Sequence, residues 1–241
     1  MSQGNISIWL QFALQQMAAE SYLDQLASGR QLKDILTDGN NDIRAIPPEQ
    51  FSGKTRFTDQ LTSYFVPAPG SSARYQIVDH HANDATGFSA TLMKDFNIGQ
   101  YTLSFRSTES APAVQGGDRE RDLFGADAEF GFSGFAFGQL AAMEDYFTRL
   151  KHGIRSDGTV DASLQAFFSN PVHQINVTGY SLGSHLATVF TELHGFETNT
   201  AFSFGHTYAF NGPGRGTFVA LPSKSAEVQR MCAMSAERMA A

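Results

Sequence analysis

The sequence predicts an α/β fold in a single domain, with a mostly parallel central sheet and helices on both faces. Three observations lead to this prediction. The chain has 241 residues with 41% hydrophobic and 17% charged residues, an ordinary globular composition that is long enough for one well-buried core. In its second half, extended and helical patterns alternate, which is typical of a parallel sheet covered by helices. Alternating segments at 88–93 and 101–105 flank a turn and predict a hairpin, so one edge should be antiparallel.

The single domain is expected to span residues 1–241, with an N-terminal helical segment at 1–66 and a core at 74–220. Helical periodicity runs over residues 6–28, and Gly29 is a suitable C-terminal stop. The remaining elements are expected in this order: strands at 74–78, 88–93 and 101–105, a long polar loop at 108–130, helices at 135–151 and 161–168, a strand at 174–178, a helix at 182–194 closed by Gly195, and a strand at 207–210.

Charge and cysteine content exclude several classes of function. The net charge of −7 argues against a nucleic-acid-binding protein and against electrostatic docking on anionic membranes. The single cysteine, Cys232, leaves no internal disulfide and no multi-cysteine metal site. No apolar run has the length of a membrane span, and no basic residue precedes the short apolar stretch at the N-terminus, so a signal peptide is not predicted.

Phenylalanine is unusually frequent, with 21 copies against one tryptophan and 7 tyrosines. These side chains could fill the core, as large apolar residues ordinarily do. Some of them could instead line an apolar pocket for acyl chains. Both interpretations remain open at this point.

The pentapeptide Gly-Tyr-Ser-Leu-Gly at 179–183 carries the main chemical signal. The pentapeptide alone is a weak signal, but here a strand is predicted before Ser181 and an amphipathic helix after it. A nucleophilic serine needs such a sharp strand-to-helix turn, and glycines two positions before and after it avoid Cβ clashes. The turn places the serine at a helix N-terminus, where the N–H of Leu182 can donate to a developing oxyanion. The competing interpretation is a serine in an ordinary glycine-rich turn.

Four ordered segments resemble the class 3, fungal-lipase-like family of α/β-hydrolases. They are the nucleophile segment at 177–190, the Phe-Arg-Ser-Thr-Glu strand end within 101–109, the Gly-Phe segment at 132–135, and the strand ending in Asn-Gly-Pro-Gly at 208–214. The chain looks closest to bacterial lipase modules of secreted proteins with repeat-in-toxin tails. The resemblance covers about residues 75–216.

The resemblance implies an α/β-hydrolase fold and a secreted carboxylic-ester hydrolase that acts on lipids as a lipase or phospholipase. It implies Ser181 as nucleophile through an acyl-enzyme, no cofactor, and contact with a membrane or micelle surface. It assigns a second oxyanion donor to Thr108. The chain departs from the family at Ser107, where the family has glycine, so a positive φ there would strain the backbone. It also has Ser184 where many members have a second glycine.

The other members of a catalytic triad are not evident after Ser181. No aspartate follows it, and the later histidines His185, His194 and His206 are poorly placed for a general base. We therefore expect the fold to be truncated at its C-terminal end, with the acid and base in a missing C-terminal region or a second chain. The alternative is a catalytically incomplete hydrolase-fold fragment or binding module. An amidase or thioesterase on the same fold is a further alternative.

Two other clusters invite a metal hypothesis. Adjacent strand residues point to opposite faces, so His80 and His81 are not expected to share one ion. The acidic residues of the long loop could bind Ca²⁺, although no EF-hand spacing is present and a solvated loop is the simpler interpretation. These loop residues are Asp118, Glu120, Asp122 and Asp127.

Overall fold

The computed structural model describes residues 3–40, 57–107, 137–195 and 202–212. The N-terminal elements are α1 (Gln3–Ala19), the 3-10 helix η1 (Leu23–Ser28), α2 (Leu32–Asp38) and α3 (Asp59–Thr62). The strands are β1 (Tyr75–His81), β2 (Ala90–Asp95), β3 (Gln100–Phe105), β4 (Gln174–Tyr180) and β5 (Ser203–Phe210). The remaining helices are α6 (Phe137–Lys151), α7 (Ala162–Phe168) and α8 (Leu182–His194).

The five strands form one mixed sheet in the order β1-β2-β3-β4-β5. β2 is antiparallel to both β1 and β3, whereas β4 is parallel to both β3 and β5. The prediction of a mostly parallel sheet is therefore wrong. The connections from β1 to β2 and from β2 to β3 are too short for a crossover, so each forces an antiparallel neighbour. The predicted hairpin is confirmed, because Ala90 pairs with Phe105 and Asp95 with Gln100.

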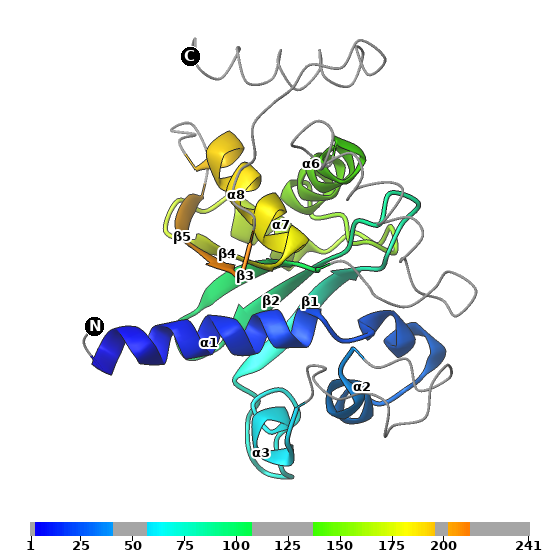
Figure 1. Ribbon diagram of the computed structural model, residues 1–241, viewed down its shortest axis with the longest axis vertical. Coiled ribbons are helices and arrows are strands. Elements are labelled where there is room, and N and C mark those ends of the chain that lie inside the picture. Colours follow the sequence, from blue (N-terminus) through cyan, green and yellow to red (C-terminus); the bar gives the residue numbers. More distant parts are fainter. Residues whose placement is uncertain (1–2, 41–56, 108–136, 196–201, 213–241) are drawn as a thin grey trace.

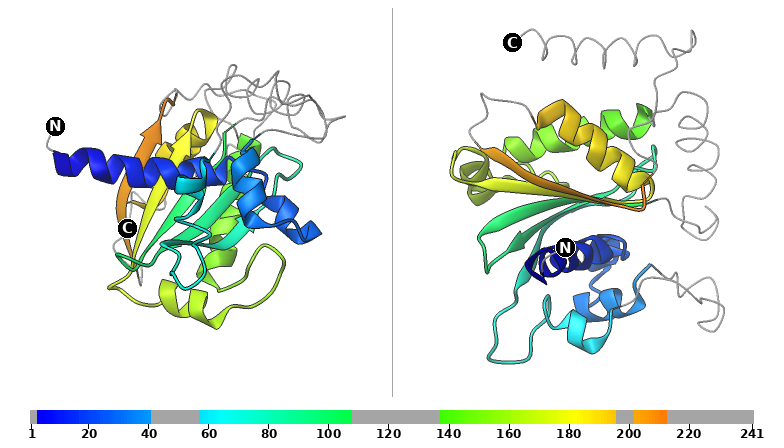
Figure 2. Two further views of the ribbon diagram at one scale, coloured as in Figure 1. Left: turned by 90° about the horizontal axis from the view of Figure 1, so that it is seen from below. Right: turned by 60° about the vertical axis from the view of Figure 1, so that its left-hand side comes forward.

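Helices cover both faces of this sheet (Figures 1 and 2). α1, α2 and α3 lie on one face, and α6, α7 and α8 lie on the other. The larger hydrophobic core lies between the sheet and the helices α6, α7 and α8, and it favours the core-packing interpretation for most phenylalanines within the described residues. Its buried phenylalanines are Phe88, Phe105, Phe147, Phe167, Phe168, Phe190 and Phe202.

A smaller hydrophobic core lies under α1, between the N-terminal helices and the strands β1 and β2. α1 ends at Ala19, and the chain leaves the helical conformation at Tyr22, with φ −76° and ψ 69°. The single helix expected over residues 6–28 is therefore two elements. The periodicity misleads here because the 3-10 turn also buries an apolar side chain, Leu23. Gly29 does stop η1, with a left-handed φ of 84°.

The elements around the pentapeptide agree with the sequence prediction. β4 extends to Tyr180, α8 spans Leu182–His194, and Gly195 is its C-terminal cap. α7 begins after Asp161, whose carboxylate accepts hydrogen bonds from the backbone N–H groups of Ser163 and Leu164. None of the helices within the described residues is both long enough and apolar enough to cross a membrane.

Candidate active site

Ser181 occupies the tight turn that joins β4 to α8. Its backbone has φ 54° and ψ −121°, a conformation that is unusual for any residue other than glycine. Among the described non-glycine residues, only Ser181 and Asn211 have a positive φ. Such a conformation costs about 1–3 kcal/mol and is typical of functional sites. The sharp strand-to-helix turn expected from the sequence is therefore present, with the serine at its apex.

The two glycines of the pentapeptide are required by close backbone contacts. A Cβ atom on Gly179 would lie 2.0 Å from the carbonyl oxygen of Gly183. A Cβ atom on Gly183 would lie 2.3 Å from the carbonyl oxygen of Phe105 and 2.7 Å from that of Arg106. No side chain fits at either position, so the first turn of α8 packs directly on the backbone at the end of β3.

The end of β5 and the residues just after it also contact this turn. The backbone N–H of Ser181 donates to the carbonyl oxygen of Phe210 at 3.0 Å. A Cβ atom on Gly212 would lie only 1.9 Å from the hydroxyl oxygen of Ser184. The departure at Ser184 therefore affects more than the start of the helix, because its side chain occupies the space beside Gly212.

Leu182 is the first residue of α8, where backbone N–H groups have no acceptor within the helix. This position is suitable for the oxyanion donor expected from the sequence. Thr108, the other expected donor, lies outside the described residues, which end at Ser107 in this region. Ser107 itself does not have a positive φ, so its replacement of the family's glycine introduces no backbone strain of that kind.

Ser107 is instead bound by a carboxylate that the sequence analysis missed. Its backbone N–H donates to Oε1 of Glu20 at 3.0 Å, and its hydroxyl donates to Oε2 of the same residue. Glu20 follows α1 and is only 5% exposed. Its burial raises the pKa of this carboxyl, and the hydrogen bond from Ser107 opposes the rise. One signal was available, since Glu20 is the first charged residue in the chain.

Gln16 connects Glu20 to the sheet. Its Nε2 donates to Oε1 of Glu20 at 2.8 Å and to the carbonyl oxygen of Phe105 at 2.9 Å. Its Oε1 accepts a hydrogen bond from the hydroxyl of Thr178 on β4. This buried polar network joins α1 to the ends of β3 and β4, which are the two strands that frame the Ser181 turn.

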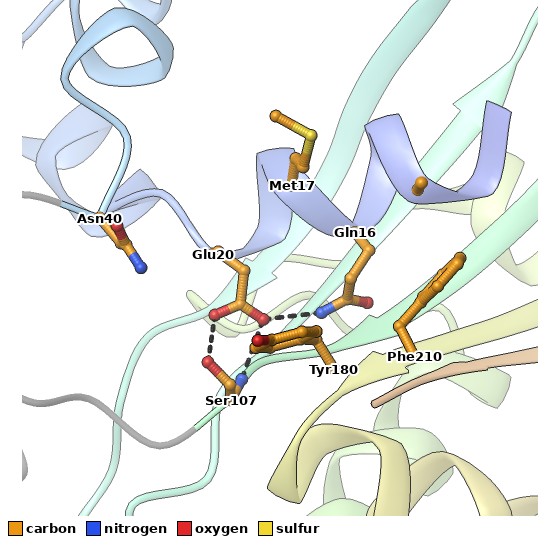
Figure 3. Close-up of a pocket in the computed structure, with 8 residues that line it drawn as sticks. Gln16, Met17, Glu20, Asn40, Ser107, Tyr180 and Phe210 are labelled. Carbon is orange, nitrogen blue, oxygen red and sulfur yellow. Dashed lines mark hydrogen bonds between the residues drawn. The ribbon is translucent and has the colours of Figure 1, made fainter. Parts of the chain in front are cut away.

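A pocket of about 280 Å³ lies next to this network. Figure 3 shows Glu20, Gln16 and Ser107 joined by hydrogen bonds on one side and Tyr180 and Phe210 close by. Tyr180 directly precedes Ser181, and the carbonyl oxygen of Phe210 accepts the backbone N–H of Ser181. The pocket therefore lies beside the candidate nucleophile. The lining residues are Ala13, Gln16, Met17, Glu20, Asn40, Ser107, Tyr180 and Phe210. Phe210 is thus the phenylalanine that fits the pocket-lining interpretation.

All seven histidines lie within the described residues, and the nearest of them along the chain, His185, donates its backbone N–H to the carbonyl oxygen of Ser181 at 3.4 Å. His185 is fully buried in α8. His194 ends the same helix, about 18 Å from Ser181 by helical rise, and bonds Glu144 at 2.7 Å. The N–H of His206 donates to Oδ1 of Asn176, about 16 Å before Ser181 along β4. His81 lies three strands from β4, about 14 Å away.

The paired histidines of β1 have separate partners, as their alternation predicts. Nδ1 of His80 lies 2.9 Å from the hydroxyl of Thr91, whereas Nε2 of His81 lies 3.4 Å from Oδ2 of Asp84. No group of three or more metal-ligating side chains occurs in the part of the chain that the structure describes. The acidic loop considered for Ca²⁺, residues 118–127, lies outside that part.

Comparison with protein families, with curated proteins and with solved structures gives no match to this chain. The site is therefore interpreted from its own geometry.

Proposed function

We propose that the protein is a serine carboxylic-ester hydrolase of the α/β-hydrolase type that acts on lipids. The conformation of Ser181 is the observation that supports this most directly. A residue other than glycine is held at φ 54° between a strand and a helix, with glycines on both sides that no other residue could replace. A serine in an ordinary glycine-rich turn would require neither the positive φ nor these close backbone contacts at both glycines.

In this proposal the hydroxyl of Ser181 attacks the ester carbonyl and forms an acyl-enzyme, with release of the alcohol. The N–H groups of Leu182 and Thr108 bind the oxyanion of the tetrahedral intermediate. Water then attacks the acyl-enzyme and regenerates the serine. Residues for binding a cofactor are not needed for any of these steps.

The pocket beside Ser181 supports an ester with an apolar part. Ala13, Met17, Tyr180 and Phe210 give it apolar walls suited to an alkyl or acyl group. Trp9 packs edge-on against Phe210 with ring centroids 5.7 Å apart, yet the residue remains 44% exposed. An exposed aromatic residue of α1 therefore lies near the pocket, a position that favours contact with a micelle or membrane surface.

A general base must also reach Ser181. His81, His194 and His206 lie on other elements with their own partners, and the side chain of His185 is fully buried in α8. We therefore propose that an imidazole from outside these 241 residues acts as base, oriented by a carboxylate. Free imidazole added to the isolated chain should then accelerate ester turnover. Ester hydrolysis by the isolated chain at a rate that imidazole does not change would contradict this part of the proposal.

A fluorophosphonate probe tests the central claim, because it phosphonylates an activated serine. Mass spectrometry should map the label to Ser181, and Ser181→Ala should remove it. Ser169→Ala is the matched control, since Ser169 caps α7 away from the pocket, and it should label as the wild type does. If the probe with added imidazole labels no residue, the protein is better described as a hydrolase-fold binding module.

A further inference from the structure

The end of β3 is held between two helices on opposite faces of the sheet. On the α8 face, Gly183 packs against the carbonyl groups of Phe105 and Arg106. On the α1 face, Gln16 bonds the same carbonyl of Phe105, and Glu20 bonds Ser107 through both of its oxygens. The backbone that faces the Ser181 turn is thus fixed from both sides, and Figure 3 shows the hydrogen bonds of Glu20 with Ser107 and Gln16 on the α1 side.

Glu20 is a costly residue for a purely structural contact. A buried carboxylate loses its hydration, and an apolar contact of similar size is often as stabilising. The site supplies compensation from several directions. Gln16 and Ser107 donate to the carboxylate, and Nη2 of Arg106 donates to the backbone carbonyl of Glu20 at 3.1 Å. Arg106 in turn lies over the ring of Tyr22, 4.6 Å from its centroid.

The hydroxyl of Ser107 is matched to this arrangement. A glycine at position 107 would offer Glu20 only its backbone N–H, whereas Ser107 offers two donors to two oxygens. The second bond restricts the rotation of the backbone at the last described residue of this strand end. Ser107 and Glu20 therefore act as a pair, although 87 positions separate them in the chain.

We propose that Glu20, with Ser107, is a positioning residue that holds the carboxyl end of β3 in register with the Ser181 turn. This inference rests on the proposed function, since the register matters only if Ser181 reacts. Glu20 touches no reacting atom. Its effect is to fix the strand end on which the first turn of α8 packs, so its loss should slow the reaction of Ser181 without changing substrate affinity.

The test compares labelling of Ser181 by a fluorophosphonate in the full chain with added imidazole. Glu20→Gln keeps the size of the side chain but replaces one acceptor oxygen by a donor, and Ser107→Ala removes only the hydroxyl. Each variant should lower the second-order labelling rate by on the order of tenfold, since a shift of about 1 Å can cost up to about 100-fold. The double variant should lose little more than either single one. With a soluble ester, kcat should fall while KM stays unchanged.

Asp79→Asn is the matched control. Asp79 is also a buried carboxylate, in β1 of the same sheet, and it accepts hydrogen bonds from the hydroxyls of Tyr146 and Ser156 at 3.0 and 2.7 Å. Its variant should unfold at lower urea concentration but label at the wild-type rate. If wild-type protein does not label, the proposed function fails together with this inference. If the wild type labels and Ser107→Ala labels equally fast, the positioning role alone is overturned.

Discussion

Replacement of Gly183 by alanine tests how closely α8 packs on β3. The added Cβ atom would lie 2.3 Å from the carbonyl oxygen of Phe105, whereas ordinary contact begins at 3.4 Å. The obstructing atoms belong to backbone on a central strand, so no side chain can rotate away. α8 and β3 must separate by about 1 Å, an overpacking strain that costs about 1–3 kcal/mol.

The same displacement moves the Leu182 N–H away from the position of the oxyanion. Because a misplacement of about 1 Å can reduce the rate about 100-fold, Gly183→Ala should lose most fluorophosphonate labelling while still folded. Urea unfolding followed by circular dichroism gives the free energy of unfolding. Labelling is then measured at urea concentrations where the variant remains native.

Gly138→Ala provides the comparison. Gly138 lies in α6, and its Cβ atom would make only ordinary contacts with Thr86, at 3.6 Å and beyond. This variant should be as stable as the wild type or up to about 1 kcal/mol more stable, through alanine's higher helix propensity. If Gly183→Ala matches Gly138→Ala in stability and labelling, the close contact between α8 and β3 does not exist.

Three further outcomes are expected. Ser181→Gly should abolish labelling yet stabilise the fold by about 1 kcal/mol in urea, because glycine relieves the positive φ that Ser181→Ala retains; equal stabilities for the two variants would refute the strain. Burial raises the pKa of Glu20, so the folded state binds its proton more tightly and the free energy of unfolding should fall as pH rises above 4.5. Glu20→Gln should remove that decline in a pH series of urea titrations. Burial, and then the charges of Arg106 and His81, lower the pKa of His80 from 6.5 to about 3. Stability present above pH 6.5 should therefore be lost on acidification by up to about 1.4 kcal/mol per pH unit, and less in His80→Asn.

The sequence predicts the parts of this fold that depend on nearby residues. The β2–β3 hairpin follows from alternation around a short turn, and α8 follows from its apolar stripe. The conformation at Ser181 follows from the glycines on either side of it, because a bulkier residue at either position would overlap backbone atoms. Each of these features depends on contacts within or immediately beside one short segment.

The pairing of the strands depends on segments that are farther apart in the chain, and the sequence predicts it less well. The sequence suggests parallel pairing because strands and helices alternate in the second half, but β1 and β2 come from the first half and pair antiparallel. The N-terminal segment is also predicted wrongly, since helical periodicity continues across Tyr22 whereas the backbone there is not helical. Hydrophobic periodicity predicts which face of a segment is buried, but it predicts less well where the backbone bends.

By itself, therefore, the sequence determines the turn that presents Ser181, because the residues that shape it are adjacent in the chain. Only the tertiary structure decides that Glu20 holds Ser107, that Gln16 links Phe105 to Thr178, and that a pocket lies between α1 and Phe210. The hydrogen bonds among these contacts join residues that are 87 to 162 positions apart in the chain. They depend on α1 crossing the sheet beside the ends of β3 and β4, and no local pattern encodes that placement.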